Sequence, residues 1–264
     1  MLELYQFELS PYSEKVRLIL DFKGLEYRKQ EVTPGIGQFE VFRLSGQRQV
    51  PVLKDGSEAI ADSTAIAQYL DQKFPEPPLT LADPQQQALN VLLEDWADRS
   101  FAADVRTVLL GALGWDPSLR EAALPNQVPG PLRNLVSAVP SEVFSVLGSG
   151  VGLSPETLRT ARLNLEQGLK ALCQRLQNQP YLLGDRPVLA DLAIAAHSLF
   201  LKFPTTAAID IPSGLRGRGV PGLVDNPDYA VFFEWRDRLY REFRRGAAVT
   251  PPSSGNGPTK IAID

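Results

Sequence analysis

Three short stretches near the N-terminus place hydroxyl, carboxylate and proline residues where helices or strands are predicted to begin: Ser10-Pro11-Tyr12-Ser13, Gln49-Val50-Pro51-Val52-Leu53 and Ala61-Asp62-Ser63-Thr64. A helix N-terminus offers unpaired backbone N–H groups and the positive end of the helix dipole. A hydroxyl at that point, such as that of Ser10, can donate a hydrogen bond to an anion. Taken alone, however, the first stretch is better explained by Ser10 or Ser13 capping a helix.

The other two stretches have the residue types that hold an extended peptide. A proline at the start of a strand indicates a cis bond before Pro51, which turns the Val50 N–H and C=O outward to pair with an added strand. The Ser63 hydroxyl and nearby helix N–H groups can bind a carboxylate, while Asp62 can accept from an ammonium group. An edge-strand proline and an ordinary N-cap are the alternative explanations.

Other kinds of chemistry have little support in the sequence. The chain has one cysteine, Cys173, which cannot form an intrachain disulfide or a cysteine-rich zinc site. The one histidine, His197, argues against a histidine-ligated metal centre and against a Ser–His triad, so we expect no metal. We interpret His197 as a packed residue on a helix face. Acyl transfer built on this histidine is a weak alternative.

Composition limits the partners and the location of the protein. Of 264 residues, 27 are basic and 31 acidic, for a formal charge of −4, so a basic surface for nucleic acid is not expected. Glu3 and Glu8 interrupt any signal-peptide pattern. The longest apolar stretch, residues 188–201, contains Asp191 and His197 and is too short to span a membrane. We therefore expect a cytoplasmic protein.

Hydrophobic periodicity predicts a mixed α/β arrangement for residues 1–74. Lys54-Asp55-Gly56-Ser57 between two apolar runs is typical of a hairpin. The remaining pattern alternates between strand and helix. The predicted order is strand 2–7, helix 14–23, strand 26–32, helix 38–44, strands 50–53 and 58–60, and helix 63–73, a small sheet covered by helices.

The rest of the chain is predicted to be helical. Prolines make residues 75–84 an extended linker. Residues 85–245 then form an all-helical domain, in which Ser154 is expected to cap one helix and Pro155 to occupy its first position. The predicted helices are 85–110, one that begins at 155, 188–203 and 226–243. Long insertions are expected at 111–153 and 204–225, and a disordered tail at 246–264.

Taken jointly, the three N-terminal stretches resemble the cytosolic glutathione transferase superfamily, in its serine-type form with the SPYS motif. The resemblance covers about residues 1–74. A weaker match runs from Leu183-Gly184-Asp185-Arg186-Pro187 to Ala190-Asp191-Leu192-Ala193-Ile194 and includes the late helix with Trp235. It implies a thioredoxin-like N-terminal domain with a mixed four-stranded sheet, and an all-α C-terminal bundle that is extended here.

The resemblance also implies roles for individual residues at the thiol end of glutathione. Ser10 stands where serine-type members stabilise the glutathione thiolate. Val50, within the stretch that begins at Gln49, would pair with the cysteinyl backbone, and Pro51 would be the cis proline. Serine at both Ser10 and Ser13 excludes the dithiol redox chemistry and mixed disulfides of the cysteine-bearing relatives.

The two ends of the tripeptide have implied partners as well. Asp62 and Ser63 would hold the γ-glutamyl end. The glycyl carboxylate needs a cation, for which Arg48 and Arg43 are both candidates. The position that often caps the helix before Asp191 in this family is Val188 here, so that helix is expected to start differently or to lose about 1 kcal/mol of capping.

The implied activity is conjugation of glutathione to small hydrophobic electrophiles held against the helical domain, with glutathione-dependent peroxide reduction as a variant. A free alkyl thiol has a pKa of about 8.5, and a hydroxyl donor at a helix N-terminus lowers it. The family resemblance also implies a homodimer. The alternatives are a non-catalytic relative that binds or assembles, and an isomerase acting on a glutathione adduct.

Overall fold

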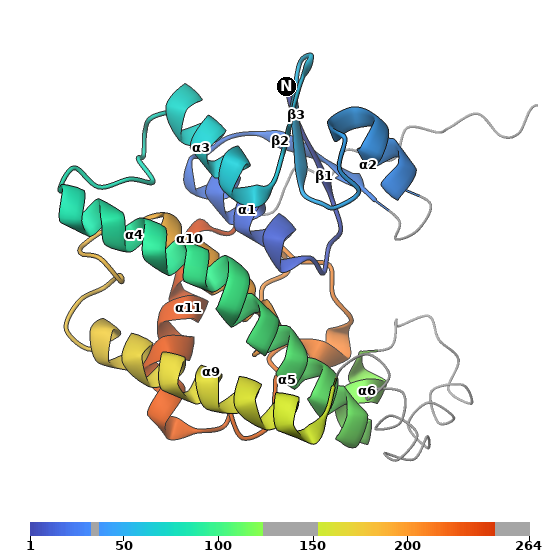
Figure 1. The fold of residues 1–264 in the computed structure, drawn as a ribbon, viewed down its shortest axis with the longest axis vertical. Coiled ribbons are helices and arrows are strands. Elements are labelled where there is room, and N and C mark those ends of the chain that lie inside the picture. The colour runs from blue at the N-terminus through green and yellow to red at the C-terminus, as the bar shows by residue number, and fades with distance from the viewer. Residues whose placement is uncertain (33–36, 124–152, 246–264) are drawn as a thin grey trace, which may run out of the picture.

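The computed structural model describes residues 1–32, 37–123 and 153–245. Its N-terminal part is a four-stranded sheet in the order β2-β1-β3-β4, with β1 parallel to β2 and antiparallel to β3. Helices flank this sheet (Figure 1). The elements are β1 (Leu2–Gln6), α1 (Pro11–Phe22), β2 (Tyr27–Glu31), α2 (Gln38–Ser45), β3 (Val52–Asp55), β4 (Glu58–Ala61) and α3 (Ser63–Lys73).

Local sequence explains the start and the buried face of the first elements. Alternation in β1 buries Leu2 and Leu4 on one face of the sheet. Ser10 caps α1, and Pro11 occupies its first position, where the missing N–H costs nothing. The apolar residues of α1 then face the core, and Ile19 is fully buried.

The C-terminal part is helical, as predicted. One long rod is interrupted by a π-helical turn, and the later helices pack beside it (Figure 1). The elements are α4 (Pro84–Trp96), the π-helical turn Ala97–Phe101, α5 (Ala102–Trp115), α6 (Pro117–Ala122), α9 (Pro155–Leu176), α10 (Leu189–His197), α11 (Ala230–Phe243), and short 3-10 turns at Ser198–Phe200, Ser213–Leu215 and Pro227–Tyr229.

One hydrophobic core joins the two parts. Helix α10 packs against both α1 and α4, and its side chains from Ala190 to His197 are buried. The chain between α3 and α4 packs against the same core. Lys23 donates hydrogen bonds to the carbonyls of Phe74 and Pro77, and the side chain of Leu79 is buried. The relative position of the two parts is thus set by packing on both sides of α1.

The fold class predicted from the sequence is confirmed, and individual helices differ in detail. The expected helix 85–110 continues to Trp115, so the first residues of the expected insertion 111–153 are helical and α6 follows them. Ser154 caps α9 as predicted, with the Thr157 N–H donating to its hydroxyl at 3.1 Å. Residues 124–152 and the tail 246–264 lie outside the described residues. The domain boundaries remain predictions.

The start of α10 shows how a missing cap is replaced. Val188 occupies the N-cap position and has no side-chain oxygen, but the Asp191 carboxylate accepts from the Val188 N–H at 3.0 Å. It also accepts from the Leu182 N–H at 2.8 Å. The helix therefore begins where the resemblance places it, with half of a capping box and a second donor from the preceding loop.

Segment 204–225 folds back on the chain before it. Lys202 and Gly219 form an antiparallel bridge, with hydrogen bonds from Phe203 N–H to Arg218 O and from Val220 N–H to Leu201 O. A Cβ at Gly219 would lie 2.0 Å from the carbonyl oxygen of Leu201, so only glycine permits this approach. Among the described helices, none combines the length and apolar character needed to cross a bilayer.

Candidate functional site

A cavity of about 510 Å³ opens beside the N-terminus of α1. Its described walls come from the loops after β1, after β2 and before β3, from the starts of α1, α2 and α3, and from one residue of α5. All of the predicted site residues except Arg43 line it, whereas Ser13 of the first motif does not. The lining residues are Phe7, Ser10, Tyr12, Val32, Gln38, Gln47, Arg48, Gln49, Val50, Pro51, Asp62, Ser63 and Arg106.

Ser10 combines a capping role with access to the cavity. Its hydroxyl oxygen accepts a hydrogen bond from the Ser13 N–H at 3.2 Å, and the side chain is half-buried. A hydroxyl can accept and donate at once, so the proton of Ser10 stays available to a ligand atom. The capping explanation and the anion-binding explanation are therefore both compatible with this geometry.

The stretch before β3 presents backbone to the same cavity. The Val50–Pro51 peptide bond is cis, as predicted. Among the described residues, no backbone hydrogen bond involves Val50, so its N–H and C=O are free to pair with an extended ligand. A second cis bond, Glu76–Pro77, was not predicted and lies away from the cavity lining.

Asp62 adopts an unusual backbone conformation at the start of α3. Its φ is 79°, the one positive value found for a described residue other than glycine, and such conformations concentrate at functional sites. One carboxylate oxygen accepts from the N–H groups of Thr64 and Ala65, at 2.9 and 3.0 Å. The other carboxylate oxygen of Asp62 is available to a ligand. Because the Thr64 and Ala65 N–H groups already donate to Asp62, a carboxylate ligand at the start of α3 can bind the N–H and the hydroxyl of Ser63.

Behind Ser63 lies a buried polar cluster that joins both parts of the fold. Lys15 of α1 is fully buried and donates to Thr64 at 3.1 Å and to Asp98 at 2.7 Å, and it also contacts Glu94. The contacts of the Ser63 hydroxyl with this cluster, 3.5 Å from Lys15 and 3.4 Å to Asp98, are at the limit of hydrogen bonding. The hydroxyl can therefore turn toward the cavity.

The π-helical turn aims Asp98 at α1. A π-turn inserts one extra residue into a helix and is frequent at functional sites. Here the Asp98 carbonyl accepts from the Tyr12 hydroxyl at 2.7 Å, and its carboxylate lies 2.7 Å from His197 Nε2. The rings of Tyr12 and His197 also meet edge to face, with centroids 4.7 Å apart.

The charges in this cluster follow from burial and contacts. Burial by itself raises the pKa of Asp98, but the hydrogen bond from His197 and the charge of Lys15 outweigh it and lower that pKa to about 2. Burial lowers the pKa of His197, against the opposing effect of Asp98. A neutral His197 then donates from Nε2, which agrees with a buried Nδ1 that has no partner among the described atoms.

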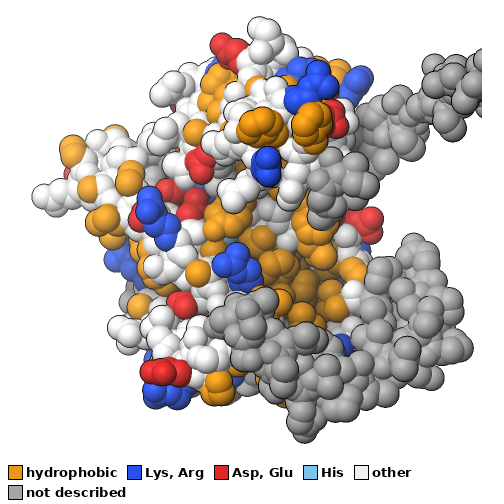
Figure 2. All heavy atoms as spheres, turned by 45° about the vertical axis from the view of Figure 1, so that its right-hand side comes forward, with side chains coloured by type: hydrophobic (Ala, Val, Ile, Leu, Met, Phe, Trp, Pro, Cys, Tyr) orange, Lys and Arg blue, Asp and Glu red, His pale blue; other side chains and the backbone are white. Residues whose placement is uncertain are grey.

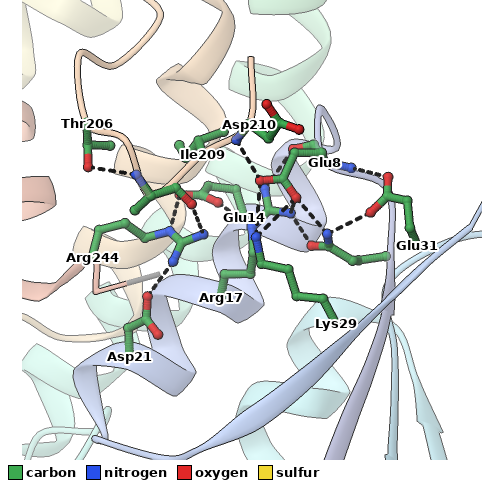
Figure 3. A network of polar contacts seen from close by, with 12 residues as sticks. Glu8, Glu14, Arg17, Asp21, Lys29, Glu31, Thr206, Ile209, Asp210 and Arg244 are labelled. Carbon is green, nitrogen blue, oxygen red and sulfur yellow. Dashed lines mark hydrogen bonds and ion pairs between the residues drawn. The ribbon is translucent and has the colours of Figure 1, made fainter. Parts of the chain in front are cut away.

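A second buried network ties the end of the helical part to the loop that carries Ser10 (Figure 3). Arg244, after α11, donates to Glu14 at 2.9 Å and to Asp21 at 2.5 Å. Glu8, two residues before Ser10, accepts from the backbone N–H of Asp210 at 3.0 Å. Segment 204–225 is thus held against the same loop.

Burial and the surrounding charges oppose each other at the acids of this network. Burial raises the pKa of Glu14, but Arg244 and Arg17 outweigh it and hold the pKa below its ordinary value. At Asp21 burial dominates, and the pKa is raised despite Arg244. Because each of these acids has an arginine partner, the network is a set of buried ion pairs rather than a ligand site.

Some residues of the site were missed by reasoning from the sequence. Tyr12 belongs to a predicted motif, yet its partner Asp98 is distant in the sequence. His197 was interpreted as a packed helix residue, and the structure adds its hydrogen bond with Asp98. Arg106 enters the cavity lining from α5 without any local signal. Cys173 is buried in α9 among leucines, as predicted.

Known proteins are similar to this chain in sequence and in fold. Residues 4–78 match a family model described as glutathione S-transferase, N-terminal domain. A zeta-class glutathione S-transferase from Euphorbia esula is 40% identical over 92 residues, which are 34% of this chain and 41% of that relative. The solved structure of a glutathione S-transferase from Sinorhizobium meliloti 1021 has a TM-score of 0.59 and 28% identity and covers 96% of both chains.

A longer alignment decides the family. The chain is 33% identical over 199 residues to glutathione S-transferase 1 from Dianthus caryophyllus, and the alignment covers 74% of each protein. The thioredoxin-like sheet, the helical part and the cavity beside α1 agree with that alignment. This chain is therefore a member of the glutathione S-transferase family.

Proposed function

We propose that the protein conjugates the thiolate of glutathione to small hydrophobic electrophiles, with Ser10 as the hydrogen-bond donor to sulfur. The observation that carries the proposal is the position of Ser10, at the N-terminus of α1 and in the wall of the cavity. Both the hydroxyl and the helix dipole favour the charged form of the thiol and so lower its pKa.

The rest of glutathione extends along the N-terminal wall of the cavity. The Val50 N–H and C=O pair with the cysteinyl backbone, next to Pro51 and Gln49. The free oxygen of Asp62 accepts from the γ-glutamyl ammonium, and Ser63 donates to the neighbouring carboxylate. Arg48 binds the glycyl carboxylate, because it lines the cavity whereas Arg43 does not.

The reaction at sulfur is a substitution. The thiol proton leaves to solvent, and the sulfur lone pair forms a C–S bond while the bond to the leaving group breaks and its electron pair departs with that group. In the peroxide variant, the thiolate attacks a peroxide oxygen, releasing an alcohol and forming a sulfenic acid that a second glutathione converts to the disulfide and water. Ser10 is a donor in both cases and never the nucleophile.

Substitution of Ser10 by alanine tests this proposal. Ser10→Ala is expected to lose most of kcat toward a chloronitroarene, to retain glutathione binding in calorimetry, and to raise the pKa of bound glutathione, read from thiolate absorbance against pH. Ser13→Ala is the matched control, because the buried Ser13 hydroxyl has no partner within the described ranges and does not line the cavity. Binding without turnover in the unmodified protein would favour the non-catalytic alternative.

We further propose that the protein is a homodimer. Helix α4 exposes apolar side chains that a monomer would leave in water, with Leu89 40%, Val91 52% and Leu92 67% exposed. Sedimentation velocity on the full chain measures the mass directly. Leu92→Glu is expected to shift the protein toward the monomer, and a monomeric unmodified protein would contradict the proposal.

A further inference from the structure

The cavity beside α1 has one wall residue from the helical part among the described residues, and that residue is a cation. Arg106 lies on α5, whereas Ser10 and Val50 belong to loops of the N-terminal part. The other arginine in the lining, Arg48, comes from the N-terminal part, where its guanidinium lies 5.6 Å from the centroid of the Phe42 ring. The two positive charges therefore belong to different walls.

The charge of Arg106 has no counterion within the described part of the chain. No ion pair or hydrogen bond to its side chain is found there. The matched comparison is Arg99, an exposed arginine on the same helical rod, which pairs with Asp95 at 2.6 Å. A guanidinium left unpaired at a cavity wall is available to an anion that enters.

Arg106 lines the same cavity as Tyr12 and acts electrostatically on its hydroxyl. Burial and the charge of Asp98 raise the pKa of Tyr12, and Arg106 acts in the opposite direction on the same hydroxyl. Tyr12 itself lines the cavity two residues after Ser10. Arg106 therefore acts in the part of the cavity near Ser10.

None of the charged groups of glutathione pairs with Arg106 in the proposed arrangement. In the proposed arrangement, Asp62 takes the ammonium, Ser63 the γ-glutamyl carboxylate and Arg48 the glycyl carboxylate. All three lie on the N-terminal wall. What remains near Arg106 is the reacting sulfur and the second substrate. The face of the molecule drawn in Figure 2 has a hollow with hydrophobic side chains on its walls.

We propose that Arg106 selects electrophiles that combine an apolar body with an anionic group, a carboxylate above all. This inference rests on the proposed conjugation activity and names its substrate class. The guanidinium donates two parallel N–H···O hydrogen bonds to the carboxylate, which hold the reacting carbon against the thiolate. A neutral electrophile of the same shape lacks this anchor and gains only from apolar contact.

Two electrophiles with the same reacting centre test the inference: a chlorodinitrobenzoate and the matching chlorodinitrobenzamide. With saturating glutathione, the unmodified protein is expected to give the larger kcat/KM for the benzoate. The measured quantity is the ratio of the two values. Arg106→Gln is expected to lower that ratio about fivefold, the size of an accessible ion pair. Arg106→Glu lowers it further, Arg106→Lys restores part of it, and Arg99→Gln leaves it unchanged.

The results distinguish a failure of the proposed selectivity from a failure of the conjugation activity on which it rests. If the unmodified protein conjugates neither probe, the conjugation activity itself fails. If it conjugates both and Arg106→Gln lowers both values equally, the ratio stays constant and Arg106 acts on the thiolate, which overturns the selectivity. A fall in the ratio that Arg106→Lys partly reverses supports the inference.

Discussion

The hydroxyl of Tyr12 donates a 2.7 Å hydrogen bond to the main-chain carbonyl of Asp98 and so joins the loop of the SPYS motif to the π-helical turn. This contact spans 86 positions in the sequence. It places a residue of the cavity lining in direct contact with the helical part.

Tyr12→Phe is expected to lower stability by about 1 kcal/mol, because it removes one hydrogen bond between the two parts while keeping the ring against His197. For a chain of this size the melting temperature should fall by about 2–4 °C in thermal unfolding. Tyr27→Phe is the control, since the buried Tyr27 hydroxyl has no partner among the described atoms. Equal melting temperatures for both variants would contradict the role of Tyr12.

Asp98→Asn is expected to lower the free energy of unfolding at neutral pH by about 3 kcal/mol. The substitution leaves the buried Lys15 without one of its two carboxylates, because the asparagine amide has a single oxygen to share between Lys15 and His197, and breaking a buried pair is costly. Chemical denaturation at pH 7 measures the loss. A loss below about 1 kcal/mol, the ordinary value for a surface pair, would contradict it.

The stability lost in Asp98→Asn is expected to depend on pH. The pKa of Asp98 is lowered from 3.8 to about 2, so its contribution to stability is present above pH 3.8 and is lost as pH falls through about 2. At about 1.4 kcal/mol per pKa unit this amounts to roughly 2 kcal/mol. The difference between the native protein and Asp98→Asn in denaturation should therefore shrink between pH 4 and pH 2. A difference that is constant over this range would contradict the assignment.

Arg244→Met is expected to lower stability by about 3 kcal/mol, because it leaves Asp21 buried without its charge partner and removes one of the two arginines of Glu14. Arg241→Met, on the exposed side of α11, should change stability by less than about 0.5 kcal/mol. Urea denaturation of both variants compares the two sites. Similar losses would show that the buried network contributes nothing beyond an exposed arginine.

Asp62→Asn is expected to weaken glutathione binding about fivefold while leaving stability nearly unchanged. Asparagine keeps an oxygen to accept from the Thr64 and Ala65 N–H groups and tolerates a positive φ, but it loses the charge that faces the ammonium in the proposed arrangement. Calorimetry with a glutathione analogue that lacks the amino group provides the control. If the substitution weakens both ligands equally, Asp62 does not bind the ammonium.

The sequence by itself determined the parts of the site that local backbone chemistry controls. Ser10 caps α1 because serine followed by proline suits a helix start, and Asp62 caps α3 for the same kind of reason. The alternation in β1 and the turn signal at Gly56 likewise act over a few residues. These features could be predicted because each depends on neighbours in the chain.

The tertiary structure alone decided what lies opposite and behind those motifs. Lys15 meets Asp98 across 83 positions, Arg244 meets Glu14 across 230, and Arg106 joins the cavity lining from another part of the fold. No short pattern encodes such pairings, because they depend on how helices pack and on the extra residue of the π-turn, which alters the direction in which later side chains point. Burial then makes these charges depend on their partners, since a charge removed from water must be paired.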